Sequence, residues 1–223
     1  RGMERATGDL VNWLNSDDIL LPRALFLLSK VYFSSEEKNA VFCGDSKRID
    51  EMGQLLSISK VHYLPFENRV LPQTPPLSGG IQASWFLTRE AWQNVQGINL
   101  ELKFTMDTDL YYRCFATGTK FYAVNNCLAA YRQHDLTKTH DGWQESVQYK
   151  KTFYYSKLKN LDKEDKRKYK RRVDKAIFGF YISSVIPSDP IMEKLIKILA
   201  AIYNYPQSLL ERHRIKRILS MLR

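Results

Sequence analysis

Two adjacent carboxylates, Asp17 and Asp18, follow an apolar segment, residues 10–14, that is predicted to be a buried strand. Neighbouring carboxylates are costly at such a place, because each disfavours the ionised form of the other. A divalent cation would offset this repulsion, and hard oxygen donors of this kind suit Mg²⁺ or Mn²⁺. Taken alone, the pair is also consistent with a solvated turn or with a cap for the helix that Pro22 begins.

Two further polar groups stand where predicted elements begin or end. Asp107 and Asp109 fall in the first turn of a helix predicted for residues 106–116, and His134 follows a strand. Ligands of open α/β sheets bind at the carboxyl ends of strands, so Asp18 and His134 could share one site. The helix dipole keeps a first-turn carboxylate ionised, which suits a general base. The alternatives are simple helix capping by the two aspartates and an ordinary polar strand end at His134.

The elements that must position these side chains alternate between strand and helix over about the first 135 residues. This alternation indicates an α/β sheet. Strands are predicted at residues 10–14, 40–45, 81–88, 121–124 and 127–131. The last two are expected to form a hairpin that turns at Asn125 and Asn126. Helices are predicted at residues 21–33, 89–95 and 106–116, and from Trp143 onward. Prolines and glycines predict a long loop over residues 46–80.

The composition is that of a folded protein with an uneven charge. Of 223 residues, 44% are hydrophobic and 13% aromatic, which suffices for one domain with an appendage. Residues 1–149 carry 15 Lys and Arg against 17 Asp and Glu, a net charge of −2. Residues 150–223 carry 19 against 7, a net charge of +12. A nearly neutral part is therefore followed by a strongly basic one.

The cysteines and the hydropathy bear on where the protein is found. Cys43, Cys114 and Cys127 lie far apart, which argues against a disulfide framework or a zinc site and favours a reducing compartment. No signal-peptide pattern is seen, and no run of about 18 apolar residues predicts a membrane span. We therefore expect a cytoplasmic protein, held peripherally at the inner face of a membrane.

Several motifs, taken in order and spacing, resemble family 2 glycosyltransferases of the GT-A fold. They are residues 6–9, 13–18, 82–86, 89–92 with Gly97, 106–110, and 131–134 with Thr137. The resemblance implies an α/β, GT-A-like (Rossmann-like) mixed sheet flanked by helices over residues 1–140, followed by a basic helical extension over residues 141–223. Relatives hold the nucleotide base with an N-terminal portion that does not precede Arg1 here, so we expect the domain to be N-terminally incomplete.

The resemblance also implies roles for residues on the donor side. Asp18 matches the last carboxylate of the family's DxD-like motif, which binds the Mn²⁺ or Mg²⁺ ion at the nucleotide diphosphate. His134 matches a further metal or diphosphate ligand. Asp17 matches a contact to the ribose or to the outer coordination shell of the metal, and Arg5 is expected to contact the nucleotide as well. Asn15 stands where many relatives carry an additional aspartate, so one acidic contact is absent here.

On the acceptor side, Asp107 matches the general base that takes the proton of the attacking hydroxyl. Asp109 is the alternative candidate for the general base. Together with Gln82 and Trp85, it is expected to face the acceptor. The resemblance thus implies an inverting, metal-dependent transfer of a sugar from a nucleotide-sugar donor to a glycan or lipid-linked acceptor. The metal would act as a Lewis acid on the leaving diphosphate. The alternative is a non-catalytic nucleotide-sugar or glycan-binding remnant of such an enzyme, because the N-terminal portion is missing.

The basic C-terminal part predicts a second partner. Lysines and arginines are dense at residues 150–151 and 163–172, and apolar residues recur at helical spacing over residues 191–202 and 209–223. Basic amphipathic helices of this kind suit an anionic membrane surface, which is our expectation. A packed helical appendage with a solvated basic face is the alternative. Basic residues interleaved with tyrosines would also suit nucleic acid, but we recognise no such motif and expect no nucleic-acid partner.

Overall fold

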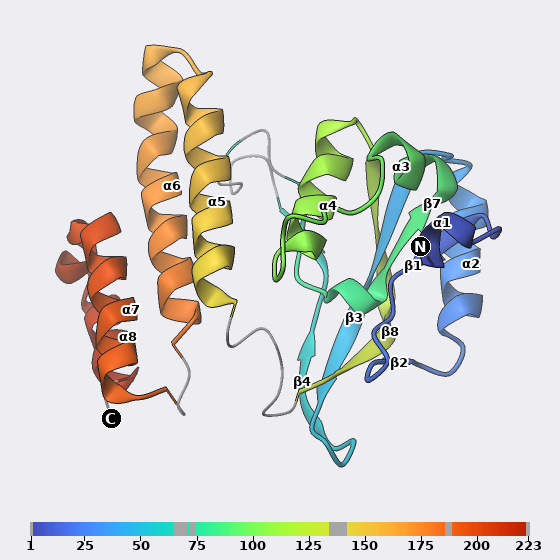
Figure 1. Cartoon of the computed structure of the whole chain (residues 1–223), viewed down its shortest axis with the longest axis horizontal. Helices are drawn as coiled ribbons and strands as arrows, with labels where there is room; N and C mark the ends of the chain where they lie inside the picture. The colour runs from blue at the N-terminus through green and yellow to red at the C-terminus, as the bar shows by residue number, and fades with distance from the viewer. Residues whose placement is uncertain (1, 65–70, 72–74, 134–141, 186–188, 222–223) are drawn as a thin grey trace. The chain divides into compact units, whose positions relative to one another are not determined.

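A computed structural model describes residues 2–64, 71, 75–133, 142–185 and 189–221 of the chain (Figure 1). The chain divides into two units, which are described separately. The first comprises residues 1–69, 73–102 and 106–137, and the second comprises residues 70–72, 103–105 and 138–223. Strands and helices make up the first unit, and the second is helical, which confirms the predicted mixed α/β class with a C-terminal helical region.

A mixed sheet of six strands, curled into a half-barrel, is the frame of the first unit. Its strands are β1 (Leu10–Asn12), β2 (Ile19–Leu20), β3 (Ala40–Ile49), β4 (Leu55–Ser59), β7 (Trp85–Thr88) and β8 (Lys120–Arg132). The order is β1-β7-β3-β8-β2, and β4 pairs with β3. Strands β3 and β8 run parallel, whereas the other described pairs of this sheet are antiparallel. A separate two-stranded sheet joins β5 (His62–Tyr63) to β6 (Leu77–Ser78).

Helices cover both faces of the six-stranded sheet. They are α1 (Gly2–Arg5), α2 (Ala24–Ser35), α3 (Arg89–Asn94) and α4 (Met106–Ala116), with a 3₁₀ turn, η2 (Gln82–Ser84), before β7. Successive side chains of a strand point to opposite faces. Val41 and Cys43 of β3 therefore pack with α3 and α4, whereas Phe42 packs with α2. The core-facing side of α4 carries Leu110 and Cys114, which are both buried.

The predicted hairpin at Asn125 and Asn126 is wrong, because β8 runs through both residues as one strand. The parallel partners of β8 pass from Gly44 opposite Val124 to Asp45 opposite Cys127, so the two asparagines are extra residues in the ladder. Extra residues in one strand form a bulge, which bends the strand without reversing it. Pairing with β3 on both sides of the bulge keeps the chain in the sheet.

Two other expectations for this unit are corrected. The segment predicted as a long loop, residues 46–80, contains the end of β3, all of β4, and the pair β5 and β6, although residues 65–70 and 72–74 lie outside the description. The predicted strand at residues 81–88 begins with η2 instead. The Ser84 hydroxyl donates to the Ile81 carbonyl over 2.8 Å and lies 2.8 Å from the buried Ser46 hydroxyl, which fixes this turn.

The second unit is a set of helices, as predicted from Trp143 onward. They are α5 (Trp143–Lys159), α6 (Lys163–Ser183), α7 (Ile191–Asn204), the 3₁₀ turn η3 (Pro206–Leu210) and α8 (Arg212–Met221). Asp162 caps α6, since its carboxylate accepts the Asp165 backbone N–H over 2.9 Å. One apolar cluster joins α5 to α6, and a second joins α6 to α7 and α8.

Among the described residues, every helix is too short or too polar to cross a lipid bilayer.

Candidate functional site

Asp18 is a buried carboxylate at the carboxyl end of β8. Strand β2, which follows it directly, pairs antiparallel with β8 and places Ile19 opposite Ala130. Asp18 is only 7% exposed, and its two oxygens accept the Arg132 backbone N–H over 3.2 Å and Asn15 Nδ2 over 3.1 Å. Burial raises the pKa of Asp18, and although both hydrogen bonds oppose this, the pKa stays above its usual value. A cation beside it would favour the ionised form.

The alternative in which Asp17 or Asp18 caps the following helix is wrong. Strand β2 stands between them and α2, and the residue before α2 is Arg23, whose φ is 66° and whose side chain makes no capping hydrogen bond. The acidic pair is instead part of a turn, in which the Asp18 backbone N–H donates to the Asn15 carbonyl over 3.2 Å. This turn is pinned to the sheet at one end by β1 and at the other by β2.

Side-chain amides link this turn to η2. Asn15 Nδ2, which donates to Asp18, also lies 3.5 Å from Gln82 Oε1, and Gln82 Nε2 donates to the Trp13 carbonyl. Three residues predicted to serve one site, Asn15, Asp18 and Gln82, are thus joined by hydrogen bonds although 67 positions separate the first from the last. The Asn15 amide nitrogen thus links two oxygen groups, the Asp18 carboxylate and the Gln82 carbonyl, which are of the kind that a hard cation prefers.

Arg132 belongs to this site, although the sequence reasoning did not assign it a role. Its Nε donates to the Asp17 carbonyl over 3.2 Å, and its Nη1 donates to the carbonyls of Asp50 and Glu51 over 3.1 and 2.9 Å. The guanidinium therefore joins the acidic turn to the turn that follows β3. The available signal was its place within residues 131–134, a segment that already carried the family resemblance.

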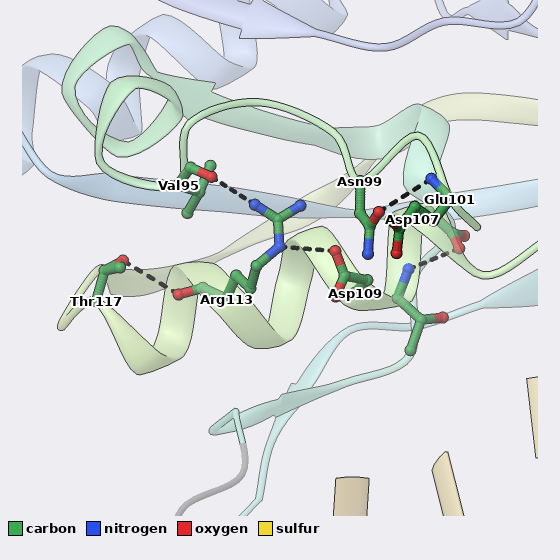
Figure 2. Close-up of polar contacts among 8 residues, drawn as sticks. Val95, Asn99, Glu101, Asp107, Asp109, Arg113 and Thr117 are labelled. Carbon is green, nitrogen blue, oxygen red and sulfur yellow. Dashed lines mark hydrogen bonds and ion pairs between the residues drawn. The ribbon is translucent and has the colours of Figure 1, made fainter. Parts of the chain in front are cut away.

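The two aspartates of α4 have different surroundings, which Figure 2 shows. Asp109 is 7% exposed, and its Oδ2 accepts Arg113 Nε over 2.7 Å. Arg113 also donates through Nη1 to the Val95 carbonyl. Asp107 is half-buried in the first turn of the helix, where its Oδ1 accepts the Thr108 backbone N–H over 2.6 Å. Asp109 is thus bound to its own helix through Arg113, whereas Asp107 stands at the helix start.

A cavity of about 790 Å³ is lined in part by Trp13 and Leu14, the two residues that precede the acidic turn. Its walls come from α1, from the end of β1 with Trp13 and Leu14, and from Trp92 with the loop at residues 96–100. Trp13 and Leu14 lead directly into Asn15, and the loop leads toward α4 through Asn99 and Glu101, which Figure 2 draws near the start of that helix. The volume is that of a small-molecule site, and tryptophan rings supply apolar surface on which a sugar can lie.

Two residues predicted for binding lie elsewhere. The Trp85 ring stacks on Tyr111 with centroids 4.6 Å apart, and its buried indole N–H has no hydrogen-bond partner within the described part of the chain. Arg5 is the exposed last residue of α1. Neither position joins the network around Asp18 through a described hydrogen bond, so their binding roles stay predictions. His134 lies outside the described residues.

The described residues provide part of the ligand set that a divalent ion needs. No group of three His, Cys, Asp or Glu side chains with metal-binding geometry occurs within them. Mg²⁺, however, usually keeps several waters and binds proteins through one or two carboxylates together with substrate phosphates. Asp18 and Asp17 are close enough for the second to raise the pKa of the first, and they provide such a pair.

A scan against models of known protein families found no match to this chain, and a search of curated proteins found none either.

Proposed function

We propose that residues 1–140 form a GT-A-like glycosyltransferase domain, which transfers a sugar with inversion from a nucleotide-sugar donor to a glycan or lipid-linked hydroxyl. The observation that carries this proposal is the buried Asp18, which is hydrogen-bonded to Asn15 and to the end of β8. The residues just before this turn, Trp13 and Leu14, line a cavity of about 790 Å³. The mixed α/β sheet supports it, because ligands of such sheets bind at the carboxyl ends of strands.

The donor would be held at the acidic turn. Asp18 would bind Mn²⁺ or Mg²⁺, and Asp17 would contact the donor ribose or the outer coordination shell of the ion. The ion would supply Lewis-acid stabilisation of the negative charge on a leaving diphosphate. Arg132 holds this turn through the Asp17 carbonyl and the Asp18 carboxylate, so that the carboxylate is positioned before a ligand arrives. The side-chain amides of Asn15 and Gln82 extend the polar network around Asp18.

Asp107 is the proposed general base. Its place in the first turn of α4 favours the ionised carboxylate, because the helix dipole is positive there. In the transfer, the acceptor oxygen forms a bond to the anomeric carbon as the bond from that carbon to the diphosphate breaks. The hydroxyl proton passes to the Asp107 carboxylate. Asp109 is less suited to this role, since Arg113 already engages its carboxylate.

A thermal-shift panel tests the proposal. Nucleoside diphosphates and nucleotide sugars are added to the whole chain, with and without Mn²⁺. A ligand at about 100 times its Kd stabilises the native state by about 2.7 kcal/mol, which for a chain of this size raises Tm by roughly 5–10 °C. We expect this shift to require Mn²⁺ and to disappear in Asp18→Asn.

The matched control is Glu51→Gln, which removes an exposed carboxylate near the same turn and should keep the shift. A shift that survives in Asp18→Asn would reject the assignment of the donor site. Binding without sugar transfer would favour the alternative, a non-catalytic nucleotide-sugar-binding domain.

A further inference from the structure

Helix α7 presents apolar side chains on the outside of the helical unit. Met192, Ile196, Leu199 and Tyr203 recur at spacings of four, three and four residues, which places them on one face of the helix. They are 65%, 54%, 63% and 82% exposed, and we call them the α7 stripe. Single exposed apolar residues are ordinary, but a continuous row marks a surface for interaction.

The opposite face of α7 is fixed inside the unit by a buried cation. Lys197 is 1% exposed, and its Nζ lies 2.8 Å from Asp189 Oδ2 and 2.7 Å from Glu193 Oε1. It also donates to the Ser184 carbonyl over 3.0 Å. A buried ammonium is tolerated only when paired and hydrogen-bonded. Rolling the helix to bury the stripe would break these contacts, so the outward direction of the stripe is built into the fold.

The helical unit that carries the stripe is strongly basic. Among residues 142–185 and 189–221, the exposed charged side chains include ten lysines and arginines but only two acids, Asp162 and Glu164. Arg171 reaches the end of α7, where its Nε donates to the Tyr205 hydroxyl over 3.4 Å, and Lys216 and Arg217 are exposed on α8. The partner that this surface fits therefore combines apolar material with negative charge.

We infer that the α7 stripe inserts into the interfacial layer of an anionic lipid membrane, while the surrounding lysines and arginines contact the lipid headgroups. This inference goes beyond the proposed transfer reaction and does not depend on it. A second copy of the chain would bring one basic surface against another, which repulsion opposes. Nucleic acid would satisfy the cations but leave the stripe in water.

The structure also changes which segment carries this binding. The sequence favoured both apolar segments near the C-terminus equally. Helix α8, however, buries Ile218 and Arg214 against the rest of the unit. Its exposed side chains include Lys216 and Arg217 but only one large apolar residue among those described, Leu219, so it supplies mainly charge. Helix α7 supplies the apolar contact.

Co-sedimentation of the whole chain with vesicles tests the inference. We expect binding to phosphatidylcholine vesicles that contain about 30 mol% phosphatidylglycerol, and weak binding to phosphatidylcholine alone. Ile196→Gln with Leu199→Gln should weaken binding by at least about tenfold, because two apolar side chains no longer enter the lipid. Lys216→Gln with Arg217→Gln should weaken binding to the anionic vesicles roughly tenfold or more.

The matched control is Met52→Gln with Leu56→Gln, which changes two side chains that are 84% and 53% exposed in the first unit and should leave binding unchanged. Circular dichroism and Tm establish that each variant is folded. Vesicle binding that survives in the α7 variant would overturn the inference. A dimer that the α7 variant converts to monomer, without vesicle binding, would assign the stripe to a second copy. A preference for RNA or DNA over anionic vesicles would also overturn it.

Discussion

Arg113 and Asp109 form an ion pair across one turn of α4, with Nε and Oδ2 2.7 Å apart. The same guanidinium reaches the Val95 carbonyl at the end of α3, so the pair ties two helices together (Figure 2). Asp107, two positions earlier, is not part of this pair and accepts the Thr108 backbone N–H. Loss of the Asp109 carboxylate should therefore lower stability, whereas loss of the Asp107 carboxylate should lower turnover.

Asp109→Asn should lower the stability of the fold. The substitution leaves Arg113 without its carboxylate partner in a site where its Nη2 atom is already buried without a hydrogen bond among the described residues. We expect a loss of about 2 kcal/mol, which lowers Tm by roughly 4–8 °C. Thermal denaturation measures it. An unchanged Tm would mean that the ion pair contributes nothing to stability.

Asp107→Asn should lower kcat by about 10²- to 10⁴-fold, because an amide cannot accept the proton of the acceptor hydroxyl. The Asn side-chain oxygen can still accept the Thr108 N–H, so Tm should change little. Steady-state kinetics with the donor found in the thermal-shift panel measures the effect. Glu101→Gln, which removes an exposed acid from the preceding loop, should keep normal turnover. Full activity in Asp107→Asn would assign the base to another residue.

Asp18→Asn should gain stability relative to the wild type as pH rises. Burial raises the pKa of Asp18 in the folded state above the ordinary 3.8. The stability that Asp18 contributes is therefore fully present below pH 3.8 and decreases as pH rises through the folded pKa. The Asn variant lacks this decrease. Chemical denaturation with EDTA at pH 3.5 and at pH 7.5 measures the difference, and a gap between the two proteins that does not change with pH would contradict the prediction.

Local signals were enough to predict α4 from the sequence, and pairing between distant segments explains what was missed. The bounds of α4, residues 106–116, follow from a first turn rich in acids and from Gly118, whose φ of 78° ends the helix. Asn125 and Asn126 look locally like a turn, but ten residues of β3 pair with β8 around them. A strand held along its length has no freedom to reverse.

The candidate site, too, was only partly visible in the sequence. The types and spacing of Asn15, Asp18 and Gln82 are visible in the sequence, and the structure joins them. The burial of Asp18 depends on the pairing of β2 with β8, which no local pattern shows. The contacts of Arg132 to the carbonyls of Asp50 and Glu51 span more than 80 positions and involve backbone atoms, so residue types could not reveal them.

The three cysteines should differ in their reaction with a thiol reagent. Cys43 and Cys114 are each 1% exposed, and burial raises the pKa of Cys114 to about 12. Cys127 is only half-buried. Because the thiolate is the reactive form, we expect at most one thiol to react in the native protein and three in denaturant. Titration with Ellman's reagent measures this. Rapid reaction of two or more native thiols would contradict the packing of α4 on β3.

Gly44 and Gly179 should respond with opposite signs to the same substitution. A Cβ on Gly44 of β3 would lie 2.5 Å from Leu128 Cδ1 and closer still to Cγ, and Leu128 is fully buried. Gly44→Ala should therefore destabilise the fold by about 1–3 kcal/mol through overpacking. Gly179, within α6, has nothing within 4 Å of such a Cβ. Gly179→Ala should stabilise the protein by about 1 kcal/mol, because alanine is the better helix former.

Chemical denaturation measures both changes, and a double-mutant cycle identifies the cause at Gly44. Leu128→Ala alone should cost about 2–5 kcal/mol because it leaves a cavity in the core. The two substitutions together should cost less than their sum, since the added methyl group occupies part of the space that the leucine vacates. Additive costs would show that Leu128 is not what excludes a side chain at Gly44.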